Sequence, residues 1–176
     1  MARVAFFTFG VLQEPRGHPQ TRGFEERVAA SFAEASTSPG FIGYPQGMHA
    51  SPDDVTLEWP AAKGPQREAM MTLSLWTDLA SVFAFSYGLR GVHNEALKLR
   101  KQWFVAPEWP NYVAWWVADD HLPTWREAVE RHRLLSERGP TPAAFDFHTP
   151  YDAEGNPVSV LRRPIALGGP KSVSDR

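Results

Sequence analysis

The sequence contains no cysteine, so disulfides, thiolate nucleophiles and thiolate-held zinc or iron-sulfur sites are excluded. It also lacks any run of about 18 apolar residues, the length that a membrane-crossing helix needs. The N-terminus reads directly into a strand rather than a signal peptide. We therefore expect a cytoplasmic protein without a membrane partner.

Neither sign of charge dominates, since 18 Lys and Arg stand against 20 Asp and Glu, for a formal net charge of -2. A nucleic-acid partner would require a basic face, so none is expected. There is no glycine-rich phosphate loop, which argues against NAD, ATP and a Rossmann-bound flavin. No serine lies in a nucleophile-elbow context, so Ser-His-Asp hydrolysis is not expected either.

Aromatic residues, in contrast, are abundant. There are 7 Trp and 11 Phe in 176 residues, and most of the tryptophans lie between residues 70 and 125. A chain of this length fits one domain. We assign that domain to residues 1–150 and expect a C-terminal arm or tail over 151–176, where Pro, Gly and charged residues take over.

Hydrophobic periodicity predicts alternating strands and helices. Expected strands cover residues 3–11, 41–44, 70–76, 111–118 and 143–148, and expected helices cover 21–35, 78–87, 92–105 and 124–138. The last helix is the best marked, because Thr124-Trp-Arg-Glu127 matches a capping box. Residues 45–67 show no clear period and are either an ordered flap, which would hide Leu57 and Trp59, or a surface loop.

This order of elements is the βαββαβ plan of a ferredoxin-like antiparallel α+β sheet, with an added C-terminal helix and strand. Helices on one face would leave the other face uncovered, yet the strands alternate between two apolar faces. Pairing two sheets face to face in a symmetric homodimer would cover it. The sequence therefore predicts a dimeric α+β barrel.

Two segments also carry a family resemblance: TLSLWTDLASVFAFSYGLRGVHNEALKLRKQWF at 72–104 and PEWPNYVAWWVADDHLPTWREA at 107–128. They resemble the bacterial domain-of-unknown-function family 3291, and the likeness runs from AFFTFG in the first strand through FDF and YDAEGNP. The resemblance implies the dimeric α+β barrel superfamily, alongside antibiotic-biosynthesis monooxygenases, polyketide cyclases and some haem enzymes. It implies no particular activity.

His93 and Arg100 are the candidate catalytic residues, since an imidazole moves protons near neutral pH. They lie seven residues apart on one helix, about 10.5 Å along its axis, so Arg100 could hold the far end of an anionic or quinone-like substrate. The alternative is structural: His93 bonded to a backbone carbonyl and Arg100 in a surface ion pair.

A pocket for a flat apolar molecule is the second expectation. Its candidate residues are Thr72, Trp76, Phe83, Tyr87, Trp103, Phe104 and Trp116, with His18 at its mouth. The same aromatic residues could equally form core and dimer interface, and His18 could lie in water.

Two further groups suggest bound metals only weakly. His132 lies on the apolar face of its helix, as a satisfied core residue or a haem ligand. Asp119-Asp120-His121 has no fourth ligand at suitable spacing, so a turn with solvated charges is favoured over a metal site.

These features favour a small enzyme of secondary metabolism that acts on an aromatic or polyketide-like compound in the barrel cavity. The reaction would be cofactor-independent monooxygenation, or cyclisation or isomerisation. The alternatives are a haem-binding barrel and a non-catalytic ligand-binding or interaction protein.

Overall fold

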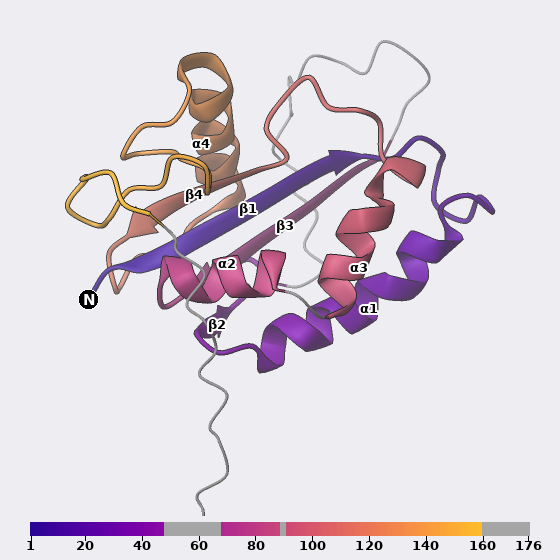
Figure 1. Ribbon diagram of the computed structural model, residues 1–176, viewed down its shortest axis with the longest axis horizontal. Helices are drawn as coiled ribbons and strands as arrows, with labels where there is room; N and C mark the ends of the chain where they lie inside the picture. The colour runs from indigo at the N-terminus through magenta and orange to yellow at the C-terminus, as the bar shows by residue number, and fades with distance from the viewer. Residues whose placement is uncertain (48–67, 89–90, 160–176) are drawn as a thin grey trace, which may run out of the picture.

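The computed structural model describes residues 1–47, 68–88 and 91–159 and is built on one antiparallel sheet (Figure 1). The four strands run in the order β2-β3-β1-β4. Their bounds are β1 (Arg3–Val11), β2 (Phe41–Gly43), β3 (Ala69–Trp76) and β4 (Tyr112–Val117). Of the loop predicted at 45–67, all but residues 45–47 lies outside the described residues.

Strand β1 lies between β3 and β4, which confirms the interior position predicted from its two apolar faces. Phe7 stands opposite Leu73 on one side and Val113 on the other, and all three side chains belong to one buried cluster. The residues next to them on each strand point to the opposite face, as the pleat requires. Both faces of the sheet therefore need a cover.

The helices supply that cover from opposite sides (Figure 1). Their bounds are α1 (Arg22–Thr37), α2 (Leu79–Tyr87), α3 (Val92–Leu99) and α4 (Trp125–Arg138), and a 3-10 turn, Arg100–Gln102, continues α3. Helices α1 and α2 contribute Ala35, Leu79 and Val82 to the cluster around Val4 and Trp76, whereas α4 contributes Trp125, Ala128 and Leu135 to the cluster around Phe7. No helix in the described part of the chain is long and apolar enough to cross a membrane.

Two expectations about the C-terminal part are wrong. The sheet face expected to lie uncovered is covered by α4, because the long connection after β4 carries the chain across to that side. The strand expected over 143–148 does not form. Instead, Phe145 makes an isolated bridge to Ala114 on the outer edge of β4, with N to O distances of 2.8 and 2.9 Å.

Residues 151–158 also fold back on the domain. The indole Nε1 of Trp116 donates to the carbonyl of Tyr151 at 2.7 Å, and the side chain of Tyr151 packs against the cluster on the α1 and α2 side of the sheet. Asp152 accepts hydrogen bonds from the backbone of Glu154 and Asn156, which closes a turn. The start of the predicted arm is thus tied to β4.

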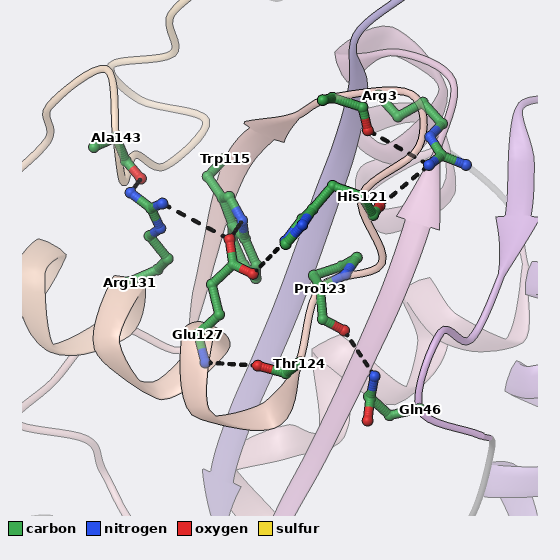
Figure 2. Close-up of polar contacts among 10 residues, drawn as sticks. Arg3, Gln46, Trp115, His121, Pro123, Thr124, Glu127, Arg131 and Ala143 are labelled. Carbon is green, nitrogen blue, oxygen red and sulfur yellow. Dashed lines mark hydrogen bonds and ion pairs between the residues drawn. The ribbon is translucent and has the colours of Figure 1, made fainter.

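Glu127 fixes α4 to the sheet, and Figure 2 shows its contacts. The hydroxyl of Thr124 accepts from the backbone N of Glu127 at 3.2 Å, which is one half of the predicted capping box. The carboxylate turns instead toward β4: it accepts from Trp115 Nε1 at 2.9 Å and contacts His121 Nε2 at 2.6 Å. Arg131 completes the group at 3.7 Å.

Replacing Glu127 by Ala is expected to lower the free energy of unfolding by about 1–3 kcal/mol, since it strands the indole N–H of buried Trp115. Glu127→Gln should cost less, because its amide oxygen can still accept from that indole. Chemical denaturation measures both. Exposed Glu137 on the same helix is the control; equal effects of Glu127→Ala and Glu137→Ala would show that the carboxylate does not anchor α4.

His132 lies inside the α4 interface and is 2% exposed. Its ring packs edge-on against Phe7 at 5.7 Å between centroids, and its Nε2 contacts the carbonyl of Pro110 at 2.5 Å. Burial lowers the pKa of His132 and outweighs the opposite effect of the Pro110 carbonyl. The prediction of a satisfied core histidine fits this environment.

This environment predicts acid sensitivity. As pH falls below about 6.5, the ordinary pKa of histidine, the unfolded chain takes up a proton that folded His132 resists. Folding stability should therefore fall with pH, by at most about 1.4 kcal/mol per pH unit for this residue. His132→Asn can still donate to Pro110 but does not titrate, so the variant should show a shallower loss of stability between pH 6.5 and 5. An unchanged slope would contradict this assignment.

Candidate functional site

The helical layers on the two faces of the sheet differ in how closely they pack against it. Helix α4 buries four residues, whereas α1 buries Ala35 alone and α3 buries none. Yet α1 carries the apolar stripe of Phe24, Val28 and Phe32. These side chains line a cavity of about 1160 Å³ between the sheet and helices α1, α2 and α3. This volume exceeds that of most sites for drug-sized molecules.

The floor of the cavity is the sheet face opposite α4. Thr72 and Tyr112 stand on either side of Thr8 in the strand register, and all three line the cavity. The Thr8 and Thr72 hydroxyls are 2.6 Å apart. Burial raises the pKa of Tyr112, so its phenol stays protonated. The floor thus offers hydroxyl groups within an otherwise apolar surface.

Aromatic rings close one end of the cavity where α3 meets the end of β1. The Phe104 ring lies over Gly10, so close that a Cβ on Gly10 would be 2.8 Å from the ring. Phe24 of α1 packs edge-on against Phe104 at 5.0 Å between centroids. The backbone N of Gln13 donates to the carbonyl of Trp103 at 2.8 Å and holds this segment on β1. A side chain larger than glycine at position 10 would displace the ring.

His93 lies at the start of α3 and lines the cavity. Its backbone N donates to the Glu34 carboxylate of α1 at 2.9 Å, and its ring lies tilted against Phe85 at 4.5 Å between centroids. Its Nδ1 is buried without a hydrogen-bond partner. Burial lowers the pKa of His93, while the Ser86 carbonyl and the Glu34 carboxylate oppose that shift. The imidazole is therefore neutral at pH 7.

Ser86 lies beside His93 in the last turn of α2 and was not foreseen as a site residue. It is 2% exposed, lines the cavity, and its Oγ has no hydrogen-bond partner. A buried hydroxyl left without a partner costs roughly 1–3 kcal/mol. Ser86 Oγ and His93 Nδ1 thus give this wall two polar atoms with unused hydrogen-bonding capacity.

Arg100 follows α3 and also lines the cavity, at the end away from His93. Its side chain is exposed, and its NH1 donates to the carbonyl of Leu97 at 2.7 Å. It makes no ion pair in the described part of the chain. The guanidinium therefore keeps donors available for a ligand.

Most of the residues predicted for the pocket line this one cavity. They are Thr72, Trp76, Tyr87, His93, Arg100, Trp103 and Phe104. Phe83 instead packs against Phe147 at 5.4 Å, Trp116 bonds to Tyr151, and exposed His18 accepts from the backbone N of Gln20 at 3.2 Å. These three side chains therefore lie outside the cavity. Their prediction failed because the periodicity of a strand or helix does not show which side chains a neighbouring segment covers.

The other candidate groups lie elsewhere. His121 contacts Glu127, and Asp119 lies 3.6 Å from Arg3 (Figure 2 shows Arg3 and His121). Within the described residues, no three His, Asp or Glu side chains come together as metal ligands would. His132 does not line the cavity, and Pro110 occupies its Nε2. It therefore does not fit the role of a haem ligand facing this space.

The start of α3 gives a further prediction. Gly91 has a φ of 127°, and a Cβ there would run into the Glu34 carboxylate. Gly139 also has a positive φ, 72°, but open space around it. Gly91→Ala should therefore reduce the free energy of unfolding by more than Gly139→Ala, which reports backbone strain alone, roughly 1–3 kcal/mol.

A double-mutant cycle separates the two causes. Removing the carboxylate with Glu34→Ala should relieve the clash, so the cost of Gly91→Ala should shrink toward that of Gly139→Ala. Additive effects in thermal or chemical denaturation would show that Glu34 does not set the position of α3.

Comparisons with known proteins address the family and not the activity. Neither the comparison with curated proteins nor that with solved structures found a match. One family model, Domain of unknown function (DUF3291), matches residues 3–160. That range contains the sheet, all four helices and every residue of the cavity described above. The chain therefore belongs to the DUF3291 family.

Proposed function

We propose that the protein binds an aromatic or polyketide-like molecule in the cavity and transfers a proton from it with His93 as general base. The observation that carries the proposal is the buried, unpartnered Nδ1 of His93 on the wall of an aromatic-lined cavity. A perturbed titratable group inside a cleft is a common property of catalytic sites.

The chemistry follows from the neutral state of His93. Its ring takes a proton from an acidic C–H or O–H of the substrate, and the substrate becomes an anion. Arg100, about 10 Å further along the helix, holds negative charge at the far end of a conjugated molecule. Return of the proton to another atom completes an isomerisation. In a cyclisation the carbanion attacks a carbonyl carbon of the same molecule, and the proton goes to the resulting alkoxide. In the monooxygenase alternative the carbanion adds to dioxygen as co-substrate, and the protonated peroxide loses water to leave a carbonyl group.

The strand order also supports a finer fold assignment. A βαββαβ chain with the order β2-β3-β1-β4 has the connections of a ferredoxin-like sheet, which agrees with the proposed α+β barrel superfamily. The homodimer remains a prediction, but its original reason is lost because α4 covers the second sheet face within one chain. The mass of the protein in solution at micromolar concentration decides it.

Two alternatives remain from the sequence. A haem-binding barrel would show a Soret band after haem addition, although His132 does not fit as its ligand. A non-catalytic binding protein would use the same cavity without needing His93 as a base. Binding of aromatic compounds with no effect of His93 on any turnover would favour this second alternative.

Deuterium exchange tests the proton transfer without knowledge of the product. A panel of aromatic 1,3-dicarbonyl and anthrone-like compounds is incubated with the protein in D₂O, and NMR follows the loss of acidic C–H signals. His93→Ala is expected to slow protein-dependent exchange by about 10²-fold or more, the usual contribution of a general base. His148→Ala, an exposed loop residue, is the control.

The pH dependence gives an independent readout. Because burial lowers the pKa of His93, protonation inactivates the base only at pH values below about 6.5. The exchange rate should therefore be flat near neutral pH and fall on the acid side of that value. Exchange by His93→Ala at the rate of the unchanged protein would falsify the catalytic role.

A further inference from the structure

Most of the charged side chains that line the cavity are cationic, although the chain as a whole has a formal net charge of -2. The cations that line it are Arg16, Arg27, Lys98, Arg100 and Lys101. Among the described residues that line the cavity, Glu25 is the acidic one. Charges of one sign around a low-dielectric cleft focus the field on its interior and attract ligands of the opposite sign.

Arg16, Arg27 and Arg100 lie toward the end of the cavity away from His93. The loop that carries Arg16 is joined to the end of α3, because Gln13 Nε2 donates to the carbonyls of Lys101 and Phe104 at 3.1 and 2.9 Å. Arg27 of α1 reaches the same end, with its guanidinium 5.8 Å from the ring centroid of Trp103. Segments far apart in sequence thus bring positive charge to the same end of the cavity.

Within the described part of the chain, Arg27 and Arg100 form no ion pair. Arg27 donates to the Gly23 carbonyl at 2.8 Å and Arg100 to the Leu97 carbonyl, which are contacts with neutral groups. Arg16 has a distant ion pair with Glu68, at 3.9 Å, and both side chains are about half exposed. A guanidinium has five donors, so each of these groups can still bind a carboxylate or sulfonate.

The opposite end of the cavity is polar, and the Glu34 carboxylate lies behind it at the start of α3. Ser86 Oγ and His93 Nδ1 lack hydrogen-bond partners there, and the Phe85 ring covers one side of His93. Between the two ends lie Phe32 and Tyr112, with the Thr8 and Thr72 hydroxyl groups of the sheet in the floor. The cavity therefore has three zones, which match an anionic head, a ring-bearing body and a neutral polar tail.

We propose that the ligand is an elongated organic anion, with its carboxylate or similar group at Arg27 and Arg100, its rings in the middle zone, and a neutral oxygen at Ser86 and His93. This assignment rests on the proposed function and specifies its substrate class. The distance from His93 to Arg100, about 10 Å along the helix, sets the separation between the reacting end and the charge. Neutral aromatic compounds of the same shape would fill the cavity without the charge contact.

Two fluorescent probes with one scaffold test this. 8-Anilinonaphthalene-1-sulfonate carries an anionic group, and N-phenyl-1-naphthylamine is the same ring system without it. Both probes brighten in apolar surroundings, so titration gives their Kd values directly. At low ionic strength the sulfonate should bind about tenfold more tightly or better, and 0.5 M NaCl should remove most of that difference by screening.

Paired variants locate the charge. Arg27→Gln/Arg100→Gln should weaken the sulfonate about tenfold and leave the neutral probe unchanged. Arg126→Gln/Arg133→Gln removes the same charge from exposed positions on α4 and should alter neither Kd. Near-ultraviolet circular dichroism of the tryptophans verifies that each variant keeps its packing, since the sulfonate also binds loosely packed states.

The possible outcomes separate the two proposals. Equal affinity for both probes, or a sulfonate Kd unaffected by Arg27→Gln/Arg100→Gln, would overturn the anionic class while leaving His93 chemistry to its own test. Displacement of the sulfonate by inorganic phosphate, beyond that by chloride at equal ionic strength, would reassign the cations to a free anion and also overturn it. Anion preference together with normal exchange by His93→Ala would retain the ligand class and reject the catalytic role.

Discussion

The sheet carries apolar side chains on both faces, and the chain has only its own helices with which to cover them. Helix α4 solves the problem on one side with large rings, since Trp125 and His132 pack directly on Phe7. The other side receives three helices but no comparable filling. The asymmetry between the two layers, rather than any single residue, creates the cavity.

Contacts at the edges of the second layer hold its helices away from the middle of the sheet. At one end, Phe104 lies over Gly10 and Phe24 lies against Phe104. At the other end, the Trp76 and Phe85 rings stack at 5.1 Å between centroids, and Glu34 anchors the start of α3. Between these two ends, the side chains of the sheet include small hydroxyl residues such as Thr8 and Thr72, which are too short to fill the space below the helices. Close packing would require larger side chains at those positions.

Local patterns predicted most of the elements, because alternation and caps are encoded within a few residues. The strand from Ala69 to Trp76 and the Thr124 cap of α4 follow directly from sequence. The face chosen by α4 does not, since a helix after a long connection can pack on either side of a sheet with the same period. Phe145 shows a related limit: its alternating neighbours suggested a strand, yet a single bridge to Ala114 satisfies it.

In the candidate site, too, the residues within one local pattern were predictable, whereas those brought together by packing were not. His93 and Arg100 stand out because they lie on one local helical run, whereas Ser86 reads as an ordinary small residue on an apolar helix until its Oγ is found buried without a partner. Arg16 and Arg27 come from segments more than sixty residues before α3, and the nearly balanced total charge hides their convergence with Arg100. Net charge describes the sum over the chain, while the field at a site depends on which charges the fold brings together. The sequence alone offered a single cation, Arg100, for an anionic or quinone-like substrate, whereas the fold brings Arg16 and Arg27 to the same cavity.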